Sequence, residues 1–237
     1  MKWSFFFTSA VGKKIVMALT GLFLISFLLV HVGLNSCIFN DIVNPGDNGS
    51  MFNRAAAFMG DSYVIRIIEI GLFAFFLLHI IQGYVVEISN RKKRKTGYQV
   101  GLGNRGSTWM SRSMAILGTL IFLYLIMHIS QFWIPSRVTG TLEEKEYLNN
   151  GRQYHDLFLK MYQTFQSGLI VILYLVGVSA LFFHLIHGFH AAFRSIGVHN
   201  KKYLAVLKGL GYGFSVIVCL LFALMPVSMY FQWVSPY

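Results

Sequence analysis

The sequence predicts an all-α integral membrane protein with five transmembrane helices. Hydrophobic residues make up 55% of the 237 residues, charged residues make up 12%, and the mean hydropathy is positive. This composition is typical of membrane proteins and not of soluble domains. Five apolar stretches can each cross about 30 Å of hydrocarbon, which takes about 20 helical residues. Backbone groups in lipid must pair within their own segment, so each stretch is expected to be a helix.

The predicted helices follow one another along a single transmembrane domain, residues 1–237. The apolar core of a signal peptide is about 7 to 15 residues long. The first apolar stretch is longer than this, so we expect an uncleaved first span. The loops between the spans are too short for independent domains, although short surface helices fit within them. The predicted spans are residues 15–38, 63–88, 114–134, 168–192 and 203–231.

Basic residues mark one face of the predicted bundle. They precede the first helix, follow the second and follow the fourth, whereas the opposite loops are acidic. The positive-inside rule makes the basic face cytoplasmic, with the N-terminus inside and the C-terminus outside. The net charge of +11 then indicates anchoring on anionic membrane lipid and not nucleic-acid binding. The basic residues are Lys13, Lys14, Arg91, Lys92, Lys93, Arg94, Lys95, Arg105, Arg112, Arg194, Lys201 and Lys202.

Four histidines lie inside four different predicted helices. Counted from the basic end of each helix, His31 and His128 stand roughly 25 Å up, toward the outer side. His79 and His184 stand roughly 15 to 18 Å up, nearer the inner side. Depth therefore pairs the first helix with the third, and the second with the fourth. Ionisable groups within a bilayer are costly and usually functional. The alternative for each histidine is a packed side chain that is hydrogen-bonded to a neighbouring helix.

Two imidazoles that face each other across a bundle can hold one haem iron. Bis-imidazole ligation suits a six-coordinate haem that transfers electrons, whereas zinc or di-iron sites need cysteines or several carboxylates. The chain lacks the C-x-x-C-H motif of covalent haem, and Cys37 and Cys219 are interpreted as small apolar side chains. The sequence thus predicts that the first four helices form a haem-binding bundle for two b haems.

Glycines recur beside the predicted ligands. Both inner histidines are followed four residues later by a glycine, which lies on the same helix face and leaves room for a flat macrocycle. Gly21 and Gly118 precede the outer histidines by ten residues, near the level of the inner pair. They either admit a ring or simply allow close helix packing. His187, one turn from His184, is the fallback ligand, and the repeated H-x-x-x-G pattern favours His184.

Charged residues at the ends of the spans have two interpretations each. Arg112 and Arg194, on the inner side, could contact haem propionates or snorkel to lipid phosphate. Glu69 lies well within a span, one turn after Arg66. These two residues form either a local ion pair or a site that protonates quinone. No catalytic residue is assigned.

The chain resembles the di-haem cytochrome b subunit of succinate:quinone oxidoreductases, of the type with a single five-helix anchor polypeptide. The resemblance covers nearly the whole chain. Each motif is weak alone, but their order and spacing together are fairly specific. It rests on residues 9–14 (SAVGKK), residues 17–23 (MALTGLF), residues 111–114 (SRSM), the run 184–197, and His31 and His128.

The resemblance implies that His31 and His128 ligate the haem distal to the soluble subunits, and that His79 and His184 ligate the proximal haem. It implies a flavoprotein partner with covalent FAD, which holds the dicarboxylate active site, and an iron–sulfur partner on the cytoplasmic face. Electrons would pass from the clusters to the inner haem, the outer haem and then quinone, or in reverse. The chain would thus be the quinone-reactive subunit of a succinate dehydrogenase or fumarate reductase, in the tricarboxylic acid cycle and electron transport. The resemblance also implies a bacterial cytoplasmic (inner) membrane and menaquinone as substrate.

One departure from the family concerns the fourth helix. Some members that oxidise menaquinol carry a glutamate just before the ligand, where this chain has Phe182 and Phe183. The sequence leaves open the direction of turnover, the quinone type, the haem potentials, any coupling to proton movement and the oligomeric state. The residues considered for quinone contact are Asn35, Glu69, Ser130 and Gln131.

Two other functions remain open from the sequence. One is a di-haem b cytochrome that anchors a different quinone-linked dehydrogenase or hydrogenase, in which four core helices are usual. The other is a proton-coupled transporter with a histidine pathway. A transporter predicts inverted repeats and broken helices, and the sequence shows glycines but no clear helix breaks.

Overall fold

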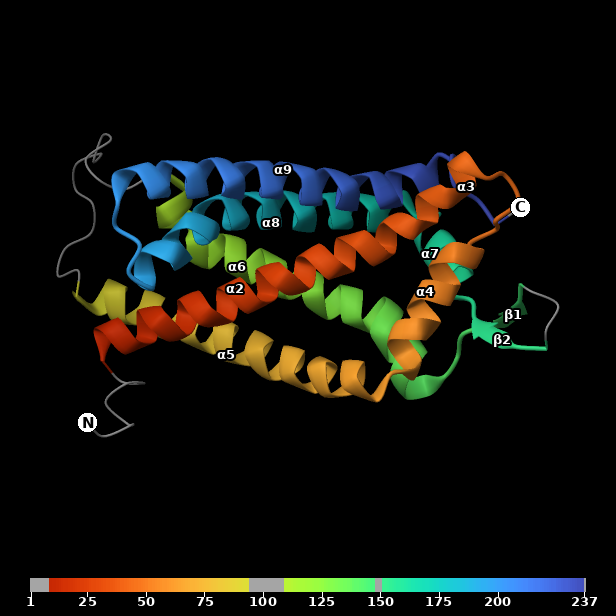
Figure 1. The fold of residues 1–237 in the computed structure, drawn as a ribbon, viewed down its shortest axis with the longest axis horizontal. Helices are drawn as coiled ribbons and strands as arrows, with labels where there is room; N and C mark the ends of the chain where they lie inside the picture. Colours follow the sequence, from red (N-terminus) through yellow and green to blue (C-terminus); the bar gives the residue numbers. More distant parts are fainter. Residues whose placement is uncertain (1–8, 94–108, 148–150, 237) are drawn as a thin grey trace. The chain divides into compact units, whose positions relative to one another are not determined.

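The computed structural model describes residues 9–93, 109–147 and 151–236. It is helical apart from one short hairpin, and five of its helices are long and apolar enough to cross a membrane. The predicted basic residues Arg94, Lys95 and Arg105 lie outside the described residues, as does the side chain of Lys93. Figure 1 traces the elements from the N-terminus to the C-terminus.

The long helices are α2 (Ala10–Asn35), α5 (Tyr63–Lys93), α6 (Trp109–His128), α8 (Gly168–Ser195) and α9 (Lys201–Tyr230). α2 begins five residues before the predicted span, so Lys13 and Lys14 lie inside the helix and do not precede it. Lysine stems can lie along apolar surface while the ammonium group reaches water, which lets a spanning helix start before its charges. Pro226 lies within α9 and does not end it.

α6 does not continue as a regular α-helix to the end of its predicted span. It ends at His128 and is followed by two π-helical turns, η2 (Ile129–Trp133) and η3 (Pro135–Thr139). Pro135 has no amide hydrogen to donate and begins the second of these turns. π-turns are rare and frequently lie at functional sites.

Shorter elements fill the two longer loops. The 310 turn η1 (Ser36–Phe39), α3 (Asn40–Val43) and α4 (Ser50–Asp61) connect α2 to α5. The antiparallel hairpin of β1 (Glu144–Glu146) and β2 (Gln153–His155) precedes α7 (Leu157–Phe165), and Lys145 lies opposite Tyr154. The hairpin was not predicted from the sequence.

The chain divides into two compact units, and every long helix contributes to both. The first unit comprises Met1–Ser26, Gly71–Ile121 and Ala180–Val216. In it, Phe23 of α2 stacks on Phe75 of α5, with ring centroids 4.5 Å apart. The hydroxyls of Tyr84 in α5 and Thr119 in α6 lie 2.8 Å apart. A Cβ atom added to Gly211 of α9 would lie 2.6 Å from the Phe189 ring of α8, so these two helices approach closely there.

The second unit comprises Phe27–Ile70, Phe122–Ser179 and Ile217–Tyr237. Its polar loops pack around Asn53 of α4, which is fully buried. The Asn53 amide donates to Asp156 Oδ1 (2.8 Å) and to the Tyr147 hydroxyl (2.6 Å), and its oxygen accepts from the Phe158 amide (2.9 Å). Asp156 also caps α7 by accepting from the Leu159 amide. One buried amide thereby joins α4, the hairpin segment and α7.

Candidate functional site

In the first unit the structure brings His79 of α5 and His184 of α8 together. Their ring centroids are 6.2 Å apart and the ring planes are inclined at 67°. Both side chains are half-buried among the apolar residues of the long helices. This is the pair that depth along the helices predicts for the inner side.

A buried hydroxyl lies against the second nitrogen of His79. Thr20 of α2 is 1% exposed, and its Oγ1 lies 3.0 Å from His79 Nδ1. The same hydroxyl donates to the Val16 carbonyl oxygen at 2.8 Å, within its own helix. This contact was not predictable from the sequence, because Thr20 and His79 are 59 residues apart.

Two glycines face the rings of the inner pair. A Cβ atom added to Gly21 would lie 3.4 Å from His79 Cε1, and one added to Gly118 would lie 3.9 Å from His184 Cε1. Those distances are ordinary van der Waals contacts, so the packing of the chain itself would accept alanine at either position. The glycines therefore leave a methyl-sized space beside each ring.

The Nδ1 atom of His184 is buried and, within the described part of the chain, has no hydrogen-bond partner. Buried polar atoms are nearly always paired, so this atom is an exception among the buried polar atoms of the described residues. The fallback ligand His187 has its ring 5.6 Å from that of His190 on the same helix. The histidine that faces His79 is His184.

In the second unit the structure brings His31 of α2 and His128 of α6 together. Their ring centroids are 5.8 Å apart, with the planes inclined at 87°. Aromatic rings surround them: Phe27 stacks on His31, and Tyr124 stacks on His128. Phe222 of α9 lies 5.6 Å from His31, so the fifth helix, which the sequence left outside the predicted bundle, lines this pair.

The polar group nearest Nδ1 is a tyrosine hydroxyl for His128 and an amide nitrogen for His31. The Tyr174 hydroxyl of α8 donates to Gln131 Oε1 at 2.7 Å and lies 3.5 Å from His128 Nδ1. The Asn35 amide nitrogen donates to the His31 carbonyl oxygen at 2.8 Å and lies 3.3 Å from His31 Nδ1. An amide nitrogen can only donate, so this contact requires a lone pair on His31 Nδ1.

Both pairs match the spacing of two imidazoles on one iron. Two metal–nitrogen bonds of about 2 Å, with about 1 Å from each nitrogen to its ring centre, place the centroids about 6 Å apart. Within the described residues, no group of three or more His, Cys, Asp or Glu side chains could hold a metal ion. Two facing imidazoles could serve as the two protein ligands of one haem iron.

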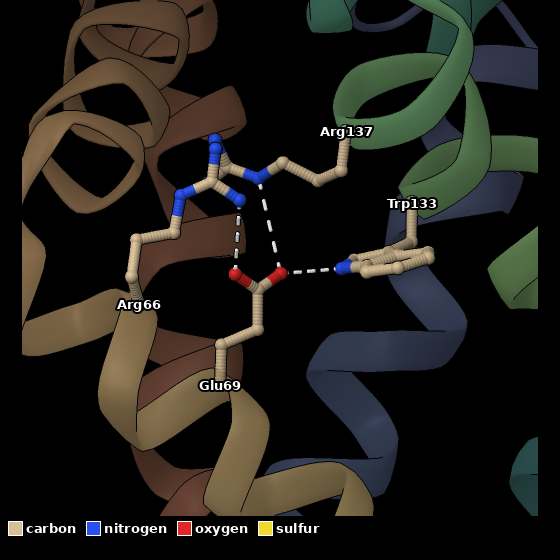
Figure 2. A network of polar contacts seen from close by, with 4 residues as sticks. All are labelled: Arg66, Glu69, Trp133 and Arg137. Atoms are coloured by element: carbon tan, nitrogen blue, oxygen red, sulfur yellow. Dashed lines mark hydrogen bonds and ion pairs between the residues drawn. The ribbon is translucent and has the colours of Figure 1, made fainter.

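Glu69 of α5 contacts two further residues besides Arg66, the neighbour that the sequence indicates. Figure 2 shows its carboxylate between Arg66, 3.3 Å away, and Arg137, 3.9 Å away. The indole Nε1–H of Trp133 donates to the same carboxylate. Trp133 and Arg137 belong to the π-helical turns that follow α6. The cluster therefore joins the start of α5 to the irregular end of the third span.

The two predicted propionate contacts are exposed side chains in the unit that holds His79 and His184. Arg112 lies in the first turn of α6 and Arg194 in the last turn of α8. His190, nearby on α8, has Nδ1 3.2 Å from the Ile186 carbonyl oxygen of its own helix. His155 is exposed in β2 and His199 is exposed in the loop before α9.

Comparisons with known proteins add no relative to this geometry: no protein-family model, no curated protein and no solved structure matches the chain.

Proposed function

We propose that this chain is the di-haem cytochrome b membrane anchor of a succinate:quinone oxidoreductase. In this role it carries electrons between an iron–sulfur subunit and quinone. The observation that carries the proposal is the pairing of four intramembrane histidines from four helices. Each pair has the centroid separation, 6.2 or 5.8 Å, expected for two imidazoles on one iron.

A haem bound at each pair supplies one-electron redox chemistry that protein side chains lack. The chain's own residues hold the imidazoles on separate rigid helices, His79 and His184 in one unit and His31 and His128 in the other. Apolar and aromatic neighbours such as Phe27 and Phe222 exclude water from the outer pair. His79 and His184 would hold one haem and His31 and His128 the other, and ligation by two histidines would suit electron transfer and not the binding of small molecules.

The charge of the first unit indicates which partner it would bind. The first unit contains fourteen of the 20 lysines and arginines but only Glu87 of the nine acidic residues. We assign this basic end to the cytoplasmic face, where an iron–sulfur subunit docks beneath His79 and His184. A flavoprotein subunit with FAD would act on succinate and fumarate. A bacterial cytoplasmic membrane is the location that fits these partners.

Polar side chains near the outer pair are the candidates for quinone contact. Gln131 accepts from Tyr174, Asn35 lies beside His31, and Ser130 lies in the π-turn after His128. The Glu69 carboxylate contacts two arginines and an indole. We expect Gln131 and Asn35 to contact quinone, with menaquinone as the substrate, and Glu69 to hold α5 against the π-turns.

The proposal is tested by the haem content and spectrum of the purified complex. We expect two b haems per chain, with His79→Ala and His184→Ala removing the same haem and His31→Ala and His128→Ala removing the other. His155→Ala and His199→Ala, at exposed positions, are matched controls that should keep both. A folded but colourless protein would rule the proposal out and favour a transporter.

A second measurement separates the proposed enzyme from other di-haem anchors. Copurified subunits should reduce a dye with succinate, whereas a hydrogenase or formate dehydrogenase anchor would bring a different activity. Loss of a haem in His187→Ala and not in His184→Ala would move the ligand assignment to His187. Loss of one common haem from both His31→Ala and His79→Ala would contradict the pairing.

A further inference from the structure

Thr20 occupies a position on α2 that faces the inner histidine pair. Its hydroxyl oxygen lies 2.8 Å from the Val16 carbonyl oxygen, 3.1 Å from that of Met17 and 3.0 Å from His79 Nδ1. The side chain is 1% exposed, so no solvent competes for these contacts. The next residue, Gly21, faces the same ring.

The single hydrogen of the Thr20 hydroxyl decides whether Thr20 or His79 is the donor in their hydrogen bond. A threonine hydroxyl has one hydrogen and two lone pairs. Its shortest contact is with the Val16 carbonyl, which can only accept, so the hydrogen is used within the helix. Toward His79 the oxygen can then only accept, and Nδ1 must carry the ring proton. A neutral imidazole with its proton on Nδ1 has a free lone pair on Nε2.

We propose that Thr20 is a positioning residue that fixes the tautomer and orientation of His79 so that Nε2 is presented to the haem iron. This inference rests on the proposed function. Metal-bound histidines almost always donate their other N–H to an acceptor, which orients the ring and makes the ligand more basic. Thr20 supplies that acceptor from a different helix than either ligand of its pair.

Across the described ranges, the other three histidines of the two pairs lack an oxygen acceptor as close to Nδ1 as Thr20 is to His79. Tyr174 has the same relation to His128, since its single hydrogen goes to Gln131 Oε1 and its oxygen faces Nδ1, but at 3.5 Å. The neighbour of His31 Nδ1 is an amide nitrogen. His184 Nδ1 has no partner among the residues described. His79 therefore has the closest oxygen acceptor of the four.

The test compares Thr20→Val, which keeps the shape and removes the acceptor, with Thr20→Ser, which keeps the hydroxyl. Thr119→Val is the matched control, because Thr119 also donates to its own helix but faces a tyrosine. The readouts are the haem retained by the purified complex against an external haem acceptor and the midpoint potential of each haem. The outer haem in the same molecule reports whether a variant has folded.

We expect Thr20→Val to weaken retention of the inner haem by about 10- to 100-fold, the usual effect of losing such a partner. The midpoint potential of that haem should rise, because a less basic imidazole stabilises the oxidised iron less. Thr20→Ser, Thr119→Val and the outer haem should match the wild type. Tyr174→Phe should affect only the outer haem and by less.

If Thr20→Val retains the inner haem and its midpoint potential as the wild type does, the inference is overturned. It is also overturned if Thr20→Ser is as impaired as Thr20→Val, because packing alone would then explain the need for threonine. If Thr20→Val does not assemble, Thr20→Ser and Thr20→Ala decide the question, because these two differ by the hydroxyl alone. A wild-type protein that binds no haem would overturn the proposed function and this inference with it, whereas a wild type with both haems and an unaffected Thr20→Val variant would overturn this inference alone.

Discussion

The side chain of Asn53 in α4 hydrogen-bonds with Tyr147, Asp156 and Phe158. Replacing Asn53 with alanine would leave the buried Phe158 amide without its acceptor and would remove one of the donors to Asp156 Oδ1, which keeps the Leu159 amide. An unpaired buried group costs about 1–3 kcal/mol. We therefore predict that Asn53→Ala lowers the thermal unfolding temperature of the purified protein. The exposed Asn44→Ala is the control, and equal unfolding temperatures for the two variants would contradict the role of Asn53.

Tyr147, a partner of Asn53, gives a prediction for pH. Burial, together with the carboxylates of Asp156, Asp47 and Asp41, raises the pKa of Tyr147 to about 12, although its hydrogen bond with Asn53 acts in the opposite direction. The folded state therefore holds the phenol proton more tightly than the unfolded state, whose pKa is about 10. The stability contributed by Tyr147 is complete below pH 10 and is lost as the pH rises toward 12.

A spectrophotometric titration of tyrosinate, as the difference between wild type and Tyr147→Phe, measures this pKa. A transition in that difference near pH 10 in the folded protein would show that Tyr147 is solvated.

At the scale of residues, the sequence could indicate the histidines but not what holds them. An ionisable side chain in an apolar span stands out by its cost, and depth along a helix follows from residue counting. Thr20 carries no such signal, because a threonine hydroxyl within a helix is usually satisfied by its own backbone. Tyr174 carries none because its ring packs as an aromatic side chain and its hydroxyl can pair with any polar group nearby. Their contacts with His79 and His128 come from the packing of different helices. The same holds for Arg137 and Trp133 beside Glu69.

At the scale of elements, α6 and α8 approach closely at Gly177. A Cβ atom added there would lie 2.4 Å from Tyr124 Cδ2 and 2.9 Å from Tyr124 Cβ, so the whole side chain would have to move. Tyr124 stacks on His128 at 5.7 Å. We predict that Gly177→Ala destabilises the protein by about 1–3 kcal/mol, as overpacking does, and weakens retention of the outer haem.

The measurement for Gly177→Ala is thermal unfolding together with the absorbance of each haem. Gly213→Ala in α9 is the control, because a Cβ atom there meets no atom within 4 Å. A Gly177→Ala variant that matches Gly213→Ala in both would show that Tyr124 can move without affecting His128.

The long helices were predictable as elements because apolar windows of their length have few alternatives. Their ends were not, since lysine and arginine stems let α2 and α6 extend past the apolar stretch at their basic ends. The hairpin was missed because its strands have three residues each and too little alternation to detect. The π-turns after His128 depend on how backbone hydrogen bonds adjust before Pro135, which no residue pattern specifies.

At the scale of the whole molecule, charge divides sharply between the two units. The second unit contains eight of the nine acidic residues and only six of the 20 basic ones. The positive-inside rule then predicts that the basic unit faces the cytoplasm. We predict that, after Cys37 and Cys219 are replaced by alanine, a membrane-impermeant thiol reagent labels Gln153→Cys in intact cells.

The same reagent should not label His199→Cys until the membrane is opened. Both positions are exposed side chains, so accessibility within the protein does not differ between them. Labelling of His199→Cys alone in intact cells would reverse the orientation and place the basic end outside.

α2 and α8 each serve both histidine pairs. α2 carries the hydroxyl that contacts His79 and also carries His31, and α8 carries the hydroxyl that contacts His128 and also carries His184. One added residue turns everything beyond it by about 100°. An insertion or deletion between Thr20 and His31, or between Tyr174 and His184, therefore changes the angle between the two groups on their own helix. Substitutions within these two stretches keep that angle, whereas a change in their length does not.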